Sequence, residues 1–188
     1  GIVFTEATAV QEIGRITPYC CGLWNDKQAE AYEKIAFFIK SMGSIPAIQL
    51  AHAGRKGSAK QPWKGGTPLE KENNVKDEAS WNTIGPSAIA VSEGWQTPTE
   101  LTVQGIKILI KDYVNAAKRA VSAGFQIIEI HAAHGYLLHS FLSPISNKRN
   151  DDYGGSHIGR TKLLKGNILI SAVGQLNRPK IPKFSGKE

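Results

Sequence analysis

The sequence is poor in cysteine and has no long apolar run. Its 188 residues include only two cysteines, Cys20 and Cys21, which are adjacent and stand in no CxxC or Cys/His spacing. A disulfide framework and a cysteine zinc site are therefore disfavoured, and we expect two plain thiols. The longest apolar runs, such as FQIIEI, are far shorter than the roughly 20 residues of a membrane helix. Since no apolar signal segment opens the chain either, we expect a cytoplasmic protein without membrane contact.

The positive charge is spread along the chain rather than clustered. Lys and Arg number 23 against 16 Asp and Glu, which gives a net charge of +7. The basic residues are scattered over helix faces, the polar loop after His52 and the last thirty or so residues. The basic and aromatic interleaving that is typical of single-strand nucleic-acid binders is missing, so we expect no nucleic-acid partner.

Three apolar segments alternate with two amphipathic helices. The predicted strands cover residues 2–10, 46–51 and 125–130. A capping box formed by Asn25 and Gln28 begins the first helix, which ends at Gly43. Thr102 begins the second helix and Gly124 ends it. The order strand, helix, strand, helix, strand predicts a parallel sheet with right-handed crossovers.

The segment from Arg55 to about Trp81 is polar and has no periodicity. A segment of this length inside a compact domain is usually functional or disordered. Because the large apolar surfaces of Trp63 and Trp81 are costly to leave exposed, we expect part of this segment to form an ordered lid.

Polar side chains follow each predicted strand. A GxGxxG turn after a strand would indicate an open doubly wound sheet, and the sequence contains none. Reactive side chains at the carboxyl ends of several strands are instead typical of a (β/α)8 barrel. These side chains are Glu6, Thr8, Gln49, His52, Glu129, His131 and His134. The sequence therefore predicts an α/β fold of the TIM-barrel type.

Two histidines and a tyrosine follow the third predicted strand in the stretch HAAHGY. Neutral imidazoles each offer one N–H donor, and two donors from His131 and His134 aimed at one carbonyl oxygen would stabilise a developing enolate. One such donor is worth roughly 3 kcal/mol. Tyr136 can then supply a proton as a general acid. We expect no catalytic part for the next histidine, His139.

The same spacing leaves other interpretations open. An HxxH pair can hold a metal ion, but a metal site needs a third and a fourth ligand, and no further His, Cys or carboxylate cluster follows. We therefore expect no metal. The two histidines could also be satisfied structural residues, and Tyr136, which precedes two leucines, could be a core residue.

Four segments carry a resemblance to a known family: TEATAVQEIGRITP, IQLAHAGRKGSA, IGPSAIA and EIHAAHGYLLHSFLSPISNKRNDDYGGS. They resemble the old yellow enzyme family of FMN-dependent ene-reductases, and most closely its xenobiotic reductase branch. The resemblance covers about residues 1–160. It implies a (β/α)8 barrel with FMN across its carboxyl-terminal mouth and NADPH or NADH as the reductant. The expected reaction is reduction of the activated C=C bond of α,β-unsaturated carbonyl or nitro compounds.

The resemblance also implies roles for single residues. Ala7 and Gln49 match flavin-contacting positions, and the amide of Gln49 would bond the pyrimidine edge of the flavin. His131 and His134 match the pair that binds the substrate oxygen. Tyr136 matches the tyrosine that protonates the α carbon of the substrate.

The later part of the chain departs from the family pattern. The segment HIGRTKLL stands where the family usually has an ENR motif, and the end of the chain is rich in Lys and Pro. We expect residues 1–174 to form a partial barrel domain and residues 175–188 to form a divergent, disordered tail. Arg149 and Asp151, in the connection after the site, are expected to be structural.

By this resemblance the chain corresponds to about strands 2 to 4 of a barrel. The first strand would precede Gly1, and strands five to eight, with the phosphate site, would follow the chain. We therefore expect a fragment of a longer protein, which in full length can form a homo-oligomer. The fragment should expose apolar faces and bind FMN weakly. The alternative is a truncated, non-catalytic paralogue of the same family.

Overall fold

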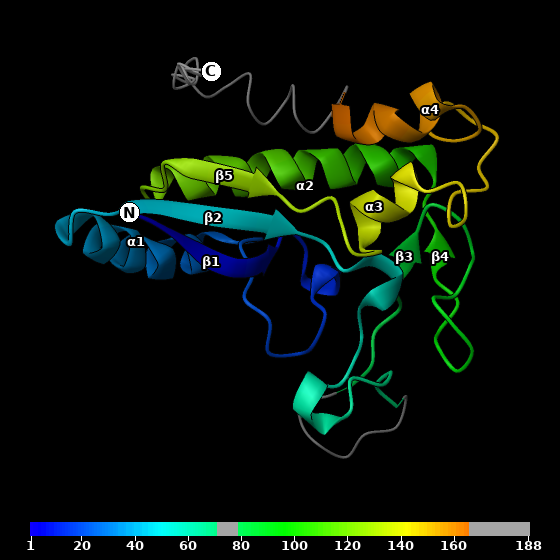
Figure 1. The fold of residues 1–188 in the computed structure, drawn as a ribbon, viewed down its shortest axis with the longest axis horizontal. Coiled ribbons are helices and arrows are strands. Elements are labelled where there is room, and N and C mark those ends of the chain that lie inside the picture. Colours follow the sequence, from blue (N-terminus) through cyan, green and yellow to red (C-terminus); the bar gives the residue numbers. More distant parts are fainter. Residues whose placement is uncertain (71–78, 166–188) are drawn as a thin grey trace, which may run out of the picture.

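The computed structural model describes residues 1–70 and 79–165. The strands of its main sheet are β1 (Ile2–Ala9), β2 (Ile45–Ala51) and β5 (Ile127–Ile130). The two long helices are α1 (Asp26–Ser41) and α2 (Val103–Ser122). The strands are parallel and lie in the order β1-β2-β5, so the predicted alternation of strands and helices is confirmed. Figure 1 shows β2 and β5 pointing toward the same end of the molecule.

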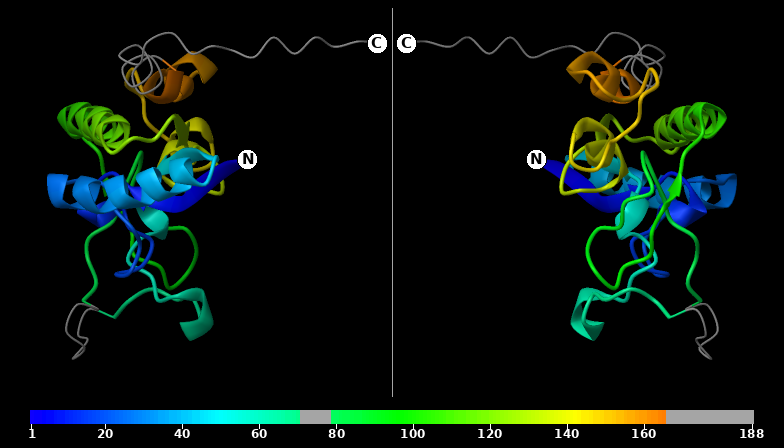
Figure 2. Two further views of the ribbon diagram at one scale, coloured as in Figure 1. Left: turned by 90° about the vertical axis from the view of Figure 1, so that its left-hand side faces the viewer. Right: turned by 90° about the vertical axis from the view of Figure 1, so that its right-hand side faces the viewer.

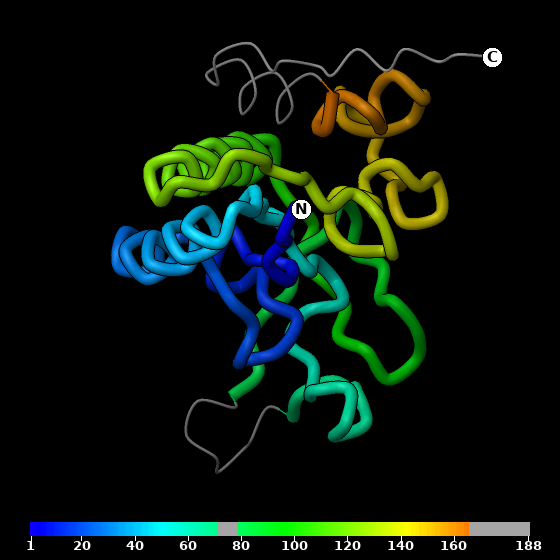
Figure 3. Tube along the Cα trace, turned by 60° about the vertical axis from the view of Figure 1, so that its left-hand side comes forward, coloured from blue at the N-terminus to red at the C-terminus, as the bar shows by residue number. Residues whose placement is uncertain are grey.

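Both long helices begin where their capping residues predict. The Asn25 side chain accepts a hydrogen bond from the Gln28 amide at 3.0 Å, and the Gln28 side chain accepts one from the Asn25 amide at 3.2 Å. Thr102 accepts a bond from the Gly105 amide at 3.0 Å and so begins α2. These side chains satisfy amides that a helix leaves unpaired in its first turn. Figure 3 shows the two helices running side by side.

The core lies between these helices and the sheet. Ile48 and Leu50 of β2 are completely buried, as are Ile106, Leu109 and Tyr113 of α2. Each large side chain buried in this way contributes roughly 1.5–3 kcal/mol. The core therefore holds α2 against β2, the middle strand. Because β5 follows α2 in the chain, this packing also positions the start of β5.

The N-terminal half of β1 is not fully covered on either face by the described residues. Ile2, Val3 and Phe4 are each about half exposed, although they belong to an apolar strand. On α1 the exposed fractions of Phe37 and Phe38 are 73% and 62%. Figure 2 shows the N-terminal end of β1 on the side away from α2. The expectation of uncovered apolar faces is thus confirmed.

Several short elements gather beyond the carboxyl ends of the strands. They are β3 (Ile84–Gly85), β4 (Thr99–Glu100), α3 (Leu137–Leu142) and α4 (His157–Lys162). β3 and β4 form a two-residue parallel ladder, which is too short to leave a periodic pattern in the sequence. Among the described residues, no helix is long and apolar enough to span a membrane.

The expected lid is only partly confirmed. Trp81 is held in place, because its indole N–H donates to the Ile13 carbonyl oxygen at 3.0 Å and the Arg15 guanidinium lies 5.1 Å from its ring centre. Trp63 is 81% exposed in the short turn η3 (Pro62–Lys64), so the expectation that it would be covered is wrong. Residues 71–78 of this segment, and the predicted boundary at residue 174 with its tail, lie outside the described residues.

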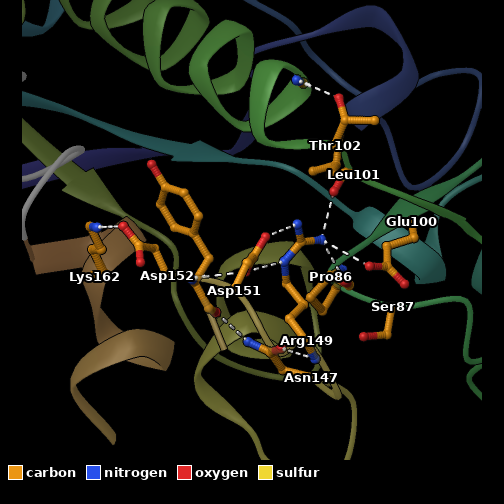
Figure 4. A network of polar contacts seen from close by, with 12 residues as sticks. Pro86, Ser87, Glu100, Leu101, Thr102, Asn147, Arg149, Asp151, Asp152 and Lys162 are labelled. Atoms are coloured by element: carbon orange, nitrogen blue, oxygen red, sulfur yellow. Dashed lines mark hydrogen bonds and ion pairs between the residues drawn. The ribbon is translucent and has the colours of Figure 1, made fainter. Parts of the chain in front are cut away.

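A buried arginine joins the loop after α3 to the β3–β4 region (Figure 4). Arg149 donates to the backbone oxygens of Pro86 and Leu101 at 2.9 and 2.6 Å. It also donates from Nε and Nη2 to the two carboxylate oxygens of Asp151 at 3.0 and 2.5 Å. These bonds hold the pKa of Asp151 below its usual value. The contacts agree with the expected structural role of both residues.

Replacing Arg149 by methionine should lower the free energy of unfolding by about 3 kcal/mol, measured by urea denaturation. The reason is that two backbone oxygens and the Asp151 carboxylate would lose their donors. Arg119→Met is the matched control, since it removes a contact of 2.7 Å with the exposed side chain of Asp26. The control should cost at most about 1 kcal/mol. Equal losses in the two variants would contradict the role given to Arg149.

Candidate active site

The predicted flavin-contacting residues lie in one row across the sheet. The strand register places Ala7 beside Gln49 and Gln49 beside Glu129. The Gln49 amide nitrogen donates to a carboxylate oxygen of Glu129 at 2.9 Å. The structure therefore brings Ala7 and Gln49 together and adds Glu129 as the partner that orients the Gln49 amide.

The two histidines and the tyrosine converge where β5 ends. The backbone N–H of His131 donates to the Leu50 carbonyl oxygen at 2.9 Å, which fixes the exit of the chain from the sheet. The centre of the His131 ring lies 5.1 Å from that of His134 and 5.2 Å from that of Tyr136. The three side chains predicted to be catalytic therefore form one cluster.

A small pocket with a cavity volume of about 10 Å³ lies beside this cluster and includes His131 and Tyr136 in its wall. Its other polar lining residues are Arg15, Cys20 and His52. Its small lining residues are Ala7, Ala9, Gly14, Ala51 and Ala53. Apart from Ile16, the apolar part of the wall thus consists of short side chains.

Burial shifts the pKa values of His131 and Tyr136 in this cluster. The pKa of His131 is lowered, first by burial and then by the neighbouring His134, while Glu129 acts in the opposite direction. Burial also raises the pKa of Tyr136, and Cys20 adds to this effect. At neutral pH the His131 imidazole is thus uncharged with one N–H to donate, and the Tyr136 phenol keeps its proton.

Lys56 was not predicted as a site residue, yet it touches the cluster. Its ammonium donates to the His134 backbone oxygen at 3.0 Å and lies 4.8 Å from the centre of the Tyr136 ring. A signal was present, because Lys56 closely follows the strand-end residue His52 in the sequence. Cys20, expected to be a plain thiol, lines the pocket, and no sequence pattern pointed to that position.

Not every polar residue at a strand end belongs to the site. Thr8 is completely buried, and its hydroxyl lies 3.0 Å from that of Tyr32 on α1, so it faces the helix layer. Glu6 is exposed and accepts a long contact of 3.5 Å from the thiol of Cys21. Thr8 and Glu6, which were not predicted as site residues, therefore lie outside the cluster.

His52 is a buried residue of the pocket wall, and hydrogen bonds fix the orientation of its ring. Its Nδ1 accepts a bond from the Gly54 amide at 3.0 Å, and its Nε2 lies 3.0 Å from the side-chain oxygen of Gln11. Gln11 in turn donates to Asp112 of α2 at 2.6 Å. A side chain at Gly14 would meet the His52 ring at 2.8 Å. His52 is thus a structural link between two site loops and α2, with its proton on Nε2.

The HxxH pair gains no further ligand in the part of the chain that the structure describes. No group of three or more His, Cys, Asp or Glu side chains lies close enough there to hold a metal ion. The ring that lies beside the His131 imidazole, together with that of His134, is the phenol of Tyr136.

Comparison with known proteins identifies the family. Residues 1–169 match the model of the NADH:flavin oxidoreductase / NADH oxidase family. The chain belongs to this family. An NADH:flavin oxidoreductase of Gibberella zeae is 47% identical over 167 residues, which cover 87% of this chain and 40% of that protein. An NADPH dehydrogenase of Listeria monocytogenes is 46% identical over 173 residues, covering 92% of this chain and 45% of the relative.

Solved structures of the flavin oxidoreductase family share the fold. Morphinone reductase superposes with a TM-score of 0.77 at 27% identity, covering 92% of this chain and 46% of that structure. An old yellow enzyme from a Pichia species superposes with a TM-score of 0.75 at 32% identity, covering 93% and 44%. The chain spans less than half the length of these relatives. Its three-stranded parallel sheet is accordingly a partial (β/α)8 barrel.

The stability of the chain should depend on pH through His52. Burial lowers the pKa of His52 from 6.5 to about 3. Between these values the unfolded chain binds more protons than the folded chain, so stability falls as the pH is lowered. The slope due to His52 should approach about 1.4 kcal/mol per pH unit.

Urea denaturation at several pH values between neutrality and mild acid tests this dependence. His52→Asn should remove the part of the slope that His52 causes, whereas His157→Asn, at the exposed start of α4, should keep it. Identical slopes in the two variants would show that His52 is not held neutral by the fold.

Proposed function

We propose that this site serves an FMN-dependent NAD(P)H oxidoreductase that reduces the activated C=C bond of α,β-unsaturated carbonyl or nitro compounds. The observation that carries the proposal is the cluster of His131, His134 and Tyr136 beside a pocket lined mainly by short side chains. The names of the relatives, NADPH dehydrogenase and NADH:flavin oxidoreductase, support the reaction class. A morphinone reductase structure in complex with tetrahydroNAD supports a nicotinamide reductant.

The residues on the sheet fit the ring system of FMN. Ala7, with its short side chain, would lie against the ring, and the amide of Gln49 would bond its pyrimidine edge. Glu129 already accepts one N–H of this amide, which leaves the other N–H and the oxygen of Gln49 for a ligand. When bound, FMN would supply hydride transfer from the nicotinamide to the alkene.

The histidine pair and the tyrosine would act on the substrate. His131 and His134 would each donate an N–H to the carbonyl or nitro oxygen and stabilise the negative charge that develops there. Tyr136 would give its proton to the α carbon, and its raised pKa keeps that proton in place until the carbanion forms. The partner of the site is thus a small molecule with an electron-poor double bond.

A non-catalytic member of the family is the second candidate. The exposed apolar residues of β1 favour it, since an open sheet offers a flavin fewer contacts than a closed barrel. The two candidates differ in whether FMN binds at all at saturating concentration. A flavin titration that shows no saturable binding would support the second candidate.

FMN should bind this chain weakly. Among the described residues the main sheet has three strands, and the strands expected to carry the phosphate site in a complete barrel are not among them. Flavin should therefore separate from the chain on gel filtration, as measured by flavin absorbance in the protein peak. Recovery of one FMN per chain would contradict this prediction.

The reaction itself is tested with 2-cyclohexenone as the substrate and NADPH as the reductant. FMN is kept in large excess over the chain, so that weak flavin binding does not hide the reaction. Tyr136→Phe should slow alkene reduction by about 10²- to 10⁴-fold while leaving NADPH oxidation by flavin and oxygen unchanged. Replacing both His131 and His134 by alanine should slow alkene reduction by at least about 10²-fold. His157→Asn is the control. Full activity in both site variants would reject the proposed roles.

A further inference from the structure

The turn that carries His134 and Tyr136 has an unusual backbone. His134 has a φ of +58° and Gly135 a φ of +77°, so two consecutive residues are left-handed. A residue other than glycine rarely adopts this conformation, because its Cβ then crowds the following carbonyl oxygen. The turn therefore depends on bonds from its surroundings to keep this shape.

Side chains from two segments supply these bonds. Lys56 donates to the His134 oxygen at 3.0 Å, and the hydroxyl of Ser140 donates to the Gly135 and Tyr136 oxygens at 3.1 and 2.9 Å. Within the turn, the side chains of Lys56 and Ser140 therefore satisfy carbonyl oxygens and no N–H group. The N–H of Gly135, between the two site residues, needs an acceptor instead.

His139 is that acceptor. Its Nδ1 lies 2.8 Å from the Gly135 nitrogen and receives the N–H, so Nδ1 carries no proton. The bond runs from α3 back to the turn that precedes the helix. It connects the amide of Gly135, which lies between His134 and Tyr136, to a side chain of α3.

We propose that His139 is a positioning residue for the reaction. Its imidazole holds the left-handed turn and thereby sets where the His134 ring and the Tyr136 hydroxyl point. His139 touches neither of these two groups in any hydrogen bond of the described residues, so it acts through the backbone of Gly135. Its importance for the reaction rests on the proposed function of His134 and Tyr136, whereas its effect on the turn does not.

Two substitutions separate this role from a general effect on the helix. In His139→Asn the side-chain oxygen reaches about the position of Nδ1 and can accept the same N–H. In His139→Leu the size is similar, but no acceptor remains. If His139 positions the turn, asparagine rescues it and leucine does not. His157→Asn again serves as the exposed control.

The Gly135 amide can be observed by itself in the free chain. His134–Gly135 is the only His-Gly pair in the sequence, so labelling histidine with ¹³C at the carbonyl and glycine with ¹⁵N selects one NMR signal. Hydrogen exchange at this amide should be about tenfold faster in His139→Leu than in wild type and near wild type in His139→Asn. Urea denaturation of the same samples shows whether global stability differs.

Equal exchange in wild type and His139→Leu would overturn the proposal, as would equal acceleration in the leucine and asparagine variants. The outcome does not depend on flavin. Alkene reduction under the FMN-excess conditions is then compared: His139→Leu should lose at least tenfold and His139→Asn should retain most of it, with NADPH oxidation unchanged. If wild type reduces no alkene but the exchange result holds, the proposed function fails while the positioning of the turn stands.

Discussion

The pairing of β2 with a parallel strand on each side is the constraint on which the site depends. It brings the carboxyl ends of β1, β2 and β5 to one edge of the sheet and places Ala7, Gln49 and Glu129 in one row. The amide of His131 then continues the ladder with its bond to Leu50. A slip of one residue in any strand would turn these side chains to the other face. Main-chain hydrogen bonds thus determine which side chains lie next to one another at this edge of the sheet.

Beyond the strand ends the chain is irregular. There, polar side chains rather than strand pairing supply the hydrogen bonds that hold the backbone in place. His52 joins the β2 loop to Gln11 and, through it, to α2, while Arg149 joins the loop after α3 to the β3–β4 region. His139 does the same for the turn before Tyr136. Loops have no periodic bonding of their own, so specific side chains must satisfy their backbone groups. His52, Arg149 and His139 therefore hold loop backbone in place by side-chain hydrogen bonds.

The strands of the sheet differ in how fully they are covered. On the helix side, α1 and α2 cover β2 and bury a continuous core. Along β1 the described residues leave large apolar side chains half exposed, as a segment of a barrel would. The residues proposed to bind the substrate lie together at the end of β5, whereas β1, which would contribute to the proposed flavin site, is partly uncovered. This asymmetry is the basis for the prediction that a chain carrying the histidine cluster binds flavin weakly.

Local patterns in the sequence determined the order and type of the main elements, the capping of both long helices and the HAAHGY cluster. These features depend on residues within one or two turns of each other, so periodicity and spacing report them directly. The sequence did not separate Thr8, which faces α1, from Ala7, which faces the pocket, and it did not indicate that His139, Lys56 and Cys20 lie at the site. Those positions were decided only by the tertiary structure, because they depend on contacts between segments that are far apart in the sequence or on the exact path of a left-handed turn.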